Sequence, residues 1–262
     1  MSTLALIGCG NMGGAILRAL LDSAGDAFDR YVTYDPNEDK RSDFSPAEPM
    51  TSAEAATRAA DVILLAVKPQ KMPGVLDEIA GVAGGKLFVS VAAGTTSASI
   101  EAKLPGARVV RTMPNTPLLA GRGVVGIAGG VTATADDIAT TKQIFQAAKQ
   151  FDIGEVQMDA LTAVSGSGPA YFFYVVECLA AAAEAEGFDS QTAYDLASAT
   201  FTGAAALLES SGASAGELRQ RVTSPGGTTA AGLSALQDGG LDALLKSTVS
   251  RAAARGRELG RD

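Results

Sequence analysis

The sequence predicts a doubly wound α/β domain with a parallel sheet, followed by an all-helical domain. Three observations support this prediction. Short β-rich runs alternate with helix-patterned segments from Met1 to about residue 157. The run 61–67 (DVILLAV) is continuously apolar, which is typical of a strand covered on both faces. After Asp159 no strand pattern is present, and stretches rich in Ala, Leu and Glu follow one another.

The first half is predicted to contain strands and helices in alternation. The predicted strands are 3–8, 30–35, 61–67, 86–92, 107–113, 124–129 and a closing strand over 151–157. The predicted helices are 12–23, 53–60, 71–80, 97–103 and 134–149. In the first helix, Ala15, Ile16, Ala19 and Leu20 follow the 3.6-residue period. The polar stretches 24–31 and 36–49 are predicted to be surface loops.

The second half is predicted to be helical throughout. Helices are expected over 169–186, 190–210, 214–221, 228–238 and 240–259. The pattern therefore divides the chain into two domains, 1–157 and 158–262.

The composition narrows the function classes. Of the 262 residues, 47% are apolar and 19% are charged, and the net charge of −8 comes without a run of Lys or Arg, which argues against nucleic acid or a membrane as partner. No apolar stretch approaches the roughly 20 residues that span a bilayer. The two distant cysteines, Cys9 and Cys178, fit a reducing cytoplasm. Because the chain has no His, a His-based zinc site and a Ser-His-Asp triad are excluded, and no metal is predicted.

A glycine motif follows the first predicted strand and precedes the first predicted helix. Gly8, Gly10 and Gly13 stand in the pattern G-x-G-x-x-G, in which the first glycine permits a tight turn, the second admits a pyrophosphate and the third allows close helix–strand packing. The helix start adds unpaired N–H groups for the phosphates. This placement favours dinucleotide binding over an ordinary glycine-rich turn.

Three polar residues follow later strands at the edge where ligands bind in such sheets. Asp35 ends the second strand and favours NADH, because a carboxylate repels a 2′-phosphate, yet Lys40 and Arg41 in the next loop are placed to reach such a phosphate. Asp35 also fits a simple turn before Pro36. Lys68 and Asn115 follow the third and fifth strands; Asn115 is expected near the nicotinamide, whereas Lys68 equally fits a solvated strand end.

Two stretches interrupt the helical half. In 163–173 (AVSGSGPAYFF), small residues precede a helix, which suits either an anion site or close helix packing. In 224–229, Ser224, Pro225, Gly226 and Gly227 lead into Thr228 and Thr229 at a helix start. A glycine costs roughly 1 kcal/mol in a helix interior, so two adjacent glycines are seldom needed where helices merely pack. We therefore interpret this stretch as a helix start whose bare N–H groups bind a substrate carboxylate, with a threonine hydroxyl beside the reacting atom.

With these residues described, the chain resembles the pyrroline-5-carboxylate reductase family over nearly its whole length. The matching stretches are IGCGNMGGAI, LLAVKPQ, RTMPNTP, DALTAVSGSGPAYFF and VTSPGGTTAAGL. The resemblance implies a Rossmann domain, a helical domain that forms a homodimer or a larger homo-oligomer, and reduction of 1-pyrroline-5-carboxylate to L-proline by NADPH or NADH. In that family the active site lies between the nucleotide domain and helices of the dimer.

The resemblance also implies roles for individual residues. The substrate carboxylate would meet Ser224, Gly226, Gly227 and Thr228, and Thr229 would hydrogen-bond the ring nitrogen as the catalytic residue. The pyrophosphate loop would comprise Gly8, Gly10, Asn11, Met12 and Gly13. The ribose and nicotinamide would lie along Ala66, Val67, Lys68 and Pro69, and along Ala93 and Gly94. Asp35 departs from many relatives, which carry a polar or basic group there.

The absent histidine agrees with this chemistry, since a cyclic imine can arrive already protonated and needs little help from a general acid. Other interpretations are a related imine reductase, a β-hydroxyacid dehydrogenase, or a dinucleotide-sensing protein without catalysis. A β-hydroxyacid dehydrogenase would need a catalytic lysine at the end of the pattern G-x-G-x-x-x-K, and this chain has Phe172 at that position.

Overall fold

The computed structural model describes residues 2–22 and 27–260 and confirms the predicted fold class. By their internal contacts the residues form two units, one made of the chain up to 167 with the stretch from 251 onward, and one made of 168–250. The first unit also takes up residues 158–167, because Leu161 packs against Gly126 and Asp159 pairs with Arg111. The sequence pattern places residues 158–167 and 251–262 in the helical domain.

The first unit is built on an eight-stranded sheet in the order β3-β2-β1-β4-β5-β6-β7-β8. The strands from β3 to β6 are parallel, β7 is antiparallel to β6, and β8 is parallel to β7. The strands are β1 (Thr3–Ile7), β2 (Arg30–Tyr34), β3 (Glu48–Pro49), β4 (Val62–Leu65), β5 (Leu87–Ser90), β6 (Arg108–Pro114), β7 (Val124–Gly129) and β8 (Lys149–Asp152).

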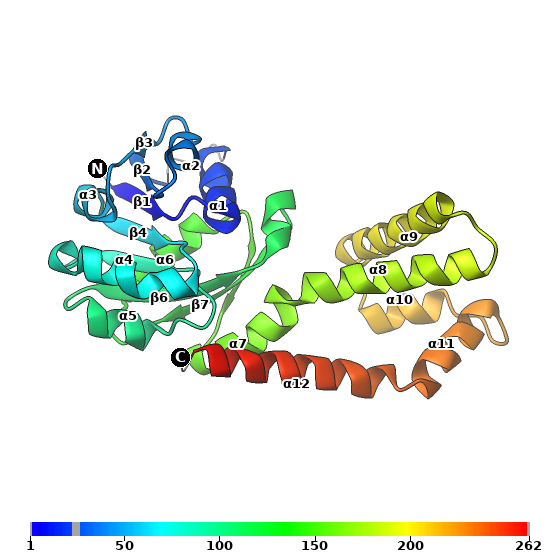
Figure 1. Cartoon of the computed structure of the whole chain (residues 1–262). Helices are drawn as coiled ribbons and strands as arrows, with labels where there is room; N and C mark the ends of the chain where they lie inside the picture. The colour runs from blue at the N-terminus through cyan, green and yellow to red at the C-terminus, as the bar shows by residue number, and fades with distance from the viewer. Residues whose placement is uncertain (1, 23–26, 261–262) are drawn as a thin grey trace. The chain divides into compact units, whose positions relative to one another are not determined.

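Helices cover both faces of this sheet (Figure 1). Along β1, Leu4 and Leu6 join the cluster beneath α1 (Asn11–Asp22) and α6 (Ala135–Ile144), whereas Ala5 and Ile7 join the opposite cluster. The opposite face is packed by α3 (Ala53–Ala59), α4 (Met72–Ile79) and α5 (Ser97–Lys103). Successive strand residues point to opposite faces, so a continuously apolar strand is buried on both, as the run 61–67 predicts.

Short helices fill the connections of the first unit. They are α2 (Glu38–Ser42), η1 (Pro69–Lys71), η2 (Ala80–Val82), η3 (Thr116–Ala120), η4 (Glu155–Gln157), α7 (Met158–Leu161) and the π-helical turn η5 (Thr162–Gly166).

The second unit contains helices only in the part described. They are α8 (Gly168–Ala185), α9 (Ser190–Ser210), α10 (Ala215–Arg221), α11 (Thr228–Asp238) and the first part of α12 (Leu241–Leu259). Val176 and Ala180 of α8 pack against Ala197 and Phe201 of α9. Among residues 2–22 and 27–260, no helix combines the length and the apolar character needed to cross a membrane.

The structure corrects three boundaries. The helix predicted over 134–149 ends at Ile144, because the buried Phe145 turns the chain and Lys149 pairs with Val124 as β8 begins. The closing strand is therefore 149–152, and 155–157 form η4. The predicted loop 36–49 contains α2, which Asn37 caps, and the two-residue strand β3. Ser23 of the predicted first helix and residues 24–26 of the predicted loop 24–31 lie outside the described residues.

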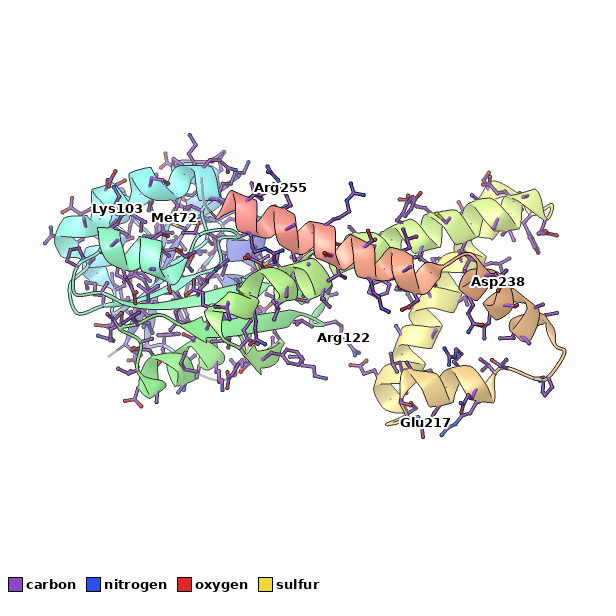
Figure 2. All side chains as sticks on the ribbon, turned by 90° about the horizontal axis from the view of Figure 1, so that it is seen from below. Met72, Lys103, Arg122, Glu217, Asp238 and Arg255 are labelled. Carbon is purple, nitrogen blue, oxygen red and sulfur yellow. The ribbon has the colours of Figure 1, made fainter. Side chains whose placement is uncertain are left out.

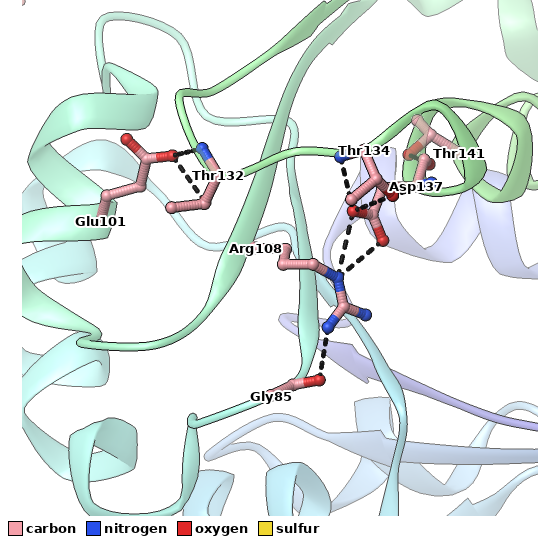
Figure 3. Close-up of polar contacts among 7 residues, drawn as sticks. All are labelled: Gly85, Glu101, Arg108, Thr132, Thr134, Asp137 and Thr141. Carbon is pink, nitrogen blue, oxygen red and sulfur yellow. Dashed lines mark hydrogen bonds and ion pairs between the residues drawn. The ribbon is translucent and has the colours of Figure 1, made fainter.

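An ion pair between a partly exposed arginine and a buried aspartate connects α6 to the sheet (Figure 3). Arg108 Nε on β6 donates to Asp137 Oδ1 and Oδ2 at 3.0 and 3.1 Å, and its Nη1 donates to the Gly85 carbonyl at 2.7 Å. The Asp137 side chain is only 6% exposed and also accepts hydrogen bonds from the Thr134 N–H and hydroxyl. Burial alone would raise the pKa of Asp137, but the bonds from Thr134 and Arg108 outweigh it and lower that pKa below its usual value.

We predict that Asp137→Asn lowers the free energy of unfolding by about 2 kcal/mol at pH 7, because it removes charge-assisted bonds in a buried place. A carboxyl group whose pKa is lowered by folding stabilises the protein above its unfolded pKa of about 4, and this contribution is lost as the pH falls through the folded pKa. The difference from wild type should therefore shrink near pH 3. Urea unfolding at pH 7 and near pH 3, at one protein concentration, measures the free energy of unfolding of both proteins.

Asp152→Asn is the control, because its ion pair with Lys142 lies on the surface with the carboxylate 62% exposed. Its expected cost is about 0.5 kcal/mol or less. An equal loss for Asp137→Asn at both pH values would contradict the electrostatic explanation.

Candidate active site

The glycine loop lies where the carboxyl ends of β1, β2 and β4 meet. Gly8 has φ +100°, and a Cβ there would lie 2.7 Å from the backbone C and O of Ala66. At Gly13 a Cβ would lie 2.2 Å from the Gly8 carbonyl oxygen. Both positions therefore require glycine, the first for its turn and the second for the approach of α1 to the sheet.

Gly10 differs from its neighbours, because a Cβ there would meet no atom within 4 Å. Its small size is thus not needed for packing. In the described part of the chain, the backbone N–H groups of Asn11, Met12 and Gly13 have no hydrogen-bond acceptor. An open glycine beside free N–H groups at a helix start is an arrangement that fits a phosphate group.

A pocket of about 310 Å³ opens beside this loop. It is lined by Cys9, Gly10, Asn11, Gly14, Ala15, Arg18, Lys40, Asp43, Phe44 and Leu119. The guanidinium of Arg18 pairs with Asp43 at 2.5 Å and lies 4.7 Å from the centre of the Phe44 ring. The pocket thus has basic, aromatic and backbone groups next to the phosphate-sized space.

Asp35 joins the glycine loop to the loop after β2. Its Oδ2 accepts from the Cys9 N–H at 3.0 Å and its Oδ1 accepts from the Asn37 N–H at 2.9 Å. Each oxygen keeps a further lone pair, so the carboxylate can still accept a ribose hydroxyl. Of the two cations that follow, Lys40 lines the pocket, whereas Arg41 bonds the Asp35 carbonyl at 3.4 Å and pairs with Glu38 at 3.6 Å.

Cys9 is a buried, neutral member of the loop. Burial raises the pKa of its thiol to about 12, with a further increase from the Asp35 carboxylate and an opposing effect of Lys40. The thiol therefore stays protonated near neutral pH, and it adds no negative charge beside a space suited to phosphate.

The segment after β4 continues along the same edge. Ala66 extends the sheet through its N–H, which donates to the Ile7 carbonyl at 2.8 Å, and Val67 lies close to Gly8. Pro69 begins η1, and Lys68 precedes it. The Lys68 side chain is exposed and makes no hydrogen bond or ion pair among the described residues.

The loop after β5 carries Ala93 and Gly94. Gly94 has φ +74°, a conformation that an L side chain rarely adopts. The Thr95 N–H donates to the Ala92 carbonyl at 3.4 Å, which closes a short turn before α5 begins at Ser97.

Asn115, at the end of β6, is buried, and both the nitrogen and the oxygen of its side-chain amide form hydrogen bonds. Its Nδ2 donates to the Ser165 carbonyl at 3.0 Å and its Oδ1 accepts from the Val124 N–H at 2.8 Å. Asn115 thereby connects β7 with the first serine of the SGSG stretch. One amide hydrogen and one lone pair remain for a ligand, and its contact with the nicotinamide stays a prediction.

The start of α11, in the second unit, lacks a side-chain cap. Gly226 has φ +70°, and Gly227 stands at the N-cap position without a side chain to accept a bond. Within the described ranges, the N–H groups of Thr228, Thr229 and Ala230 have no acceptor. Thr229 is half-buried, and Ser224 and Thr228 are exposed.

The neighbouring helix α10 shows the contrast. Ser214 and Glu217 form a capping box there, in which the Ser214 hydroxyl accepts from the Glu217 N–H at 3.2 Å and Glu217 bonds back to the Ser214 N–H at 2.7 Å (Figure 2 marks Glu217). Removing such a cap typically costs about 1 kcal/mol. The bare start of α11 is therefore a place where the chain forgoes a usual stabilising contact.

One polar cluster is absent from the sequence predictions. Arg111 on β6 is buried and pairs with Glu155 and Asp159, which come from η4 and α7. The sequence signal is a charged residue directly after the apolar pair Val109 and Val110 of the predicted strand ARVVRTM, but its partners are far along the chain.

Family models match both halves of the chain. Residues 155–259 match the model described as pyrroline-5-carboxylate reductase dimerisation, and residues 3–94 match the one described as NADP oxidoreductase, coenzyme F420-dependent.

Relatives match the chain over nearly its full length. Pyrroline-5-carboxylate reductases of Methanosarcina acetivorans and Pseudomonas aeruginosa are 36% and 39% identical; the matches cover 98% and 99% of this chain and 98% of each relative. Among solved structures, a pyrroline-5-carboxylate reductase of Coxiella burnetii is 33% identical with a TM-score of 0.92, over 98% of each chain. The pyrroline carboxylate reductase of Plasmodium falciparum with NADP bound is 27% identical with a TM-score of 0.85, over 99% of this chain and 98% of the other.

We predict that Gly10→Ala and Gly13→Ala separate binding from folding. At Gly10 the added methyl group meets no protein atom, so the thermal unfolding midpoint should stay within about 1 °C of wild type. The affinity for the dinucleotide should nevertheless fall at least about tenfold, because the methyl group occupies the space suited to phosphate. Gly13→Ala should lower both the midpoint and the affinity. Thermal unfolding and fluorescence titration with NADPH and NADH measure the two effects, and unchanged affinity in Gly10→Ala would place the cofactor elsewhere.

Proposed function

The chain belongs to the pyrroline-5-carboxylate reductase family, and we propose that its two bare helix starts hold the two reactants of that family's reaction. It is an NAD(P)H-dependent oxidoreductase that reduces 1-pyrroline-5-carboxylate to L-proline, the last step of proline biosynthesis. The uncapped glycine start of α11 is the observation that carries the proposal for substrate binding.

The substrate carboxylate binds at the start of α11. The N–H groups of Thr228, Thr229 and Ala230 point away from the helix without acceptors in the described chain, and the helix dipole adds partial positive charge there. Ser224 and the two glycines leave room for a small anion. Recognition by backbone groups needs no basic side chain.

Thr229 is the catalytic residue and hydrogen-bonds the ring nitrogen. A protonated imine is already an electrophile, so Thr229 orients the ring and shares its proton, without acting as a strong acid. The half-buried place of Thr229 beside the anion site is consistent with this role. Positioning and electrostatics then account for most of the rate enhancement, as expected in a chain without histidine.

The cofactor residues are those of the first unit. Gly8, Gly10, Asn11, Met12 and Gly13 bind the pyrophosphate, and Asp35 the adenosine ribose. Ala66, Val67, Lys68 and Pro69, the pair Ala93 and Gly94, and Asn115 lie along the ribose and nicotinamide. When bound, the reduced dinucleotide supplies the hydride that adds to the imine carbon. The open space at Gly10 and the free N–H groups of α1 support this assignment.

The protein self-associates, as the match to a dimerisation model indicates, and we propose a dimer or a larger homo-oligomer in the cytoplasm. The second unit exposes large apolar side chains on α8, among them Phe172, Phe173 and Tyr174, which are 55–66% exposed. Apolar surface of this extent favours burial against another copy. Both cysteines are free, in agreement with a reducing compartment.

The first test is the reaction of the purified protein with 1-pyrroline-5-carboxylate and NADPH or NADH, followed by the loss of nicotinamide absorbance. We predict that Thr229→Ala lowers kcat about 10- to 100-fold and leaves the dissociation constant of the cofactor within about twofold. Alanine favours helix formation, so the fold should persist.

Thr229→Ser is the matched variant, since it keeps the hydroxyl group and should retain most of the activity. Comparable losses of turnover and cofactor affinity in Thr229→Ala would indicate a folding defect. Full activity of that variant would remove Thr229 from the mechanism.

We also predict that Asp35→Ser raises the ratio of kcat/KM for NADPH to that for NADH, by about tenfold. The substitution removes the charge that repels a 2′-phosphate, while the serine hydroxyl can still accept the Cys9 N–H. Initial rates with both cofactors give the ratio. An unchanged ratio would assign the preference to Lys40 or Arg41, of which Lys40 lines the pocket.

A further inference from the structure

The cluster of the buried Arg111 with the partly buried Glu155 and Asp159 has no part in the reaction described so far. Arg111 is 3% exposed; its Nη1 lies 3.3 Å from Glu155 Oε1 and its Nη2 lies 3.9 Å from Asp159 Oδ1. A buried guanidinium requires such partners, because removing one leaves a charge without compensation. The cluster therefore fixes both carboxylates relative to β6.

Glu155 connects the ion-pair cluster to the start of α5. Its Oε1 accepts from the Ser97 N–H at 2.8 Å, and its Oε2 accepts from the Ser97 hydroxyl. Ser97 is 3% exposed and directly follows the loop that carries Ala93 and Gly94. The C-terminal end of that loop is thus hydrogen-bonded to Glu155, and Glu155 pairs with Arg111.

The last turns of α12 pack against the loop that carries Ala93 and Gly94. They belong by contacts to the same unit as the sheet, and Figure 2 marks Arg255 there. A Cβ at Gly94 would lie 3.2 Å from the Leu259 carbonyl oxygen, and one at Gly260 would lie 2.9 Å from the Gly94 carbonyl oxygen. Gly256 similarly approaches Asp159, with a Cβ position 3.2 Å from Oδ1.

These groups surround a pocket of about 200 Å³. It is lined by Gly94, Thr96, Arg111, Asp159, Arg257 and Gly260. The loop that carries Ala93 and Gly94 is therefore adjacent to the ion-pair cluster and to the end of α12. We call the last two together the α12 clamp: Arg111, Glu155, Asp159 and 256–260.

We propose that the α12 clamp is a positioning device that sets the conformation of the loop 92–96 and thereby the affinity for the nicotinamide half of the cofactor. The inference rests on the proposed function, which places Ala93 and Gly94 along that half. Most of the clamp comes from the segment that matches the dimerisation model, so this segment would contribute to cofactor binding as well as to assembly. Its members are positioning residues and touch no reacting atom.

Two variants test the clamp, each with a matched control. Gly260→Ala adds a methyl group against the Gly94 carbonyl, and its control Gly74→Ala adds one in α4, where no atom lies within 4 Å. Glu155→Gln removes the charge that faces Arg111. Its control Glu101→Gln changes a carboxylate that also accepts a threonine N–H and hydroxyl, from Thr132, and that pairs with no arginine in the described residues (Figure 3).

The readout compares a whole cofactor with a fragment that lacks the nicotinamide. Isothermal titration measures NADPH against 2′,5′-ADP, or NADH against ADP if the wild-type protein prefers NADH. We expect Gly260→Ala and Glu155→Gln to weaken binding of the whole cofactor about tenfold and fragment binding less than about twofold, with control variants near wild type for both. Steady-state rates should show a raised KM for the cofactor, with kcat changed less than about threefold.

Thermal unfolding and light scattering establish that each variant is folded and assembled as wild type. Equal weakening of whole cofactor and fragment, or unchanged binding of both in the two test variants, would overturn the inference. Failure of the wild-type protein itself to bind a reduced dinucleotide or to reduce 1-pyrroline-5-carboxylate would instead overturn the proposed function.

Discussion

The proposed reaction depends on one feature: the first backbone N–H groups of α1 and of α11 have no acceptor among the described residues. Several other helices carry side-chain caps: Thr96 on α5, Asp189 on α9 and the capping boxes of α6 and α10. At α1 and α11 the sequence places glycine where a cap would stand. Unpaired N–H groups and the helix dipole suit anions, and the two reactants carry a pyrophosphate and a carboxylate. A chain of net charge −8 can thereby bind anionic ligands with few basic side chains.

The sheet makes the first of these helix starts rigid. Residues of β1 and β4 enter the clusters on the two faces alternately, so a shift of either strand by one residue would exchange the side chains packed beneath α1 with those packed beneath α3 and α4. Gly8 and Gly13 then allow α1 to approach Ala66 more closely than any other residue would permit. Asp35 adds a bond to the Cys9 N–H, so the loop is held from both neighbouring strands. The conformation of the glycine loop thus depends on how the strands and α1 pack beneath it.

The sequence predicted well what is decided locally. The bounds of α5, α9 and α11 agree with those predicted, because a cap or a glycine pair marks each start. β3 escaped prediction, since its two residues form a strand only by pairing with Val32 and Thr33. The roles of Arg111 and Asn115 were equally hidden: their partners Glu155 and Ser165 are 44 and 50 residues away. The cap of α2 at Asn37 was a readable local signal, masked by the polar composition of 36–49.

The most direct measurement is a crystal structure of the protein with oxidised cofactor and L-proline. We predict that the proline carboxylate lies about 2.9 Å from backbone nitrogens at the start of α11, that the ring nitrogen is within hydrogen-bond distance of the Thr229 hydroxyl, and that the nicotinamide faces the ring. A carboxylate bound by other groups, with the N–H groups of 228–230 turned to solvent or to protein, would contradict it.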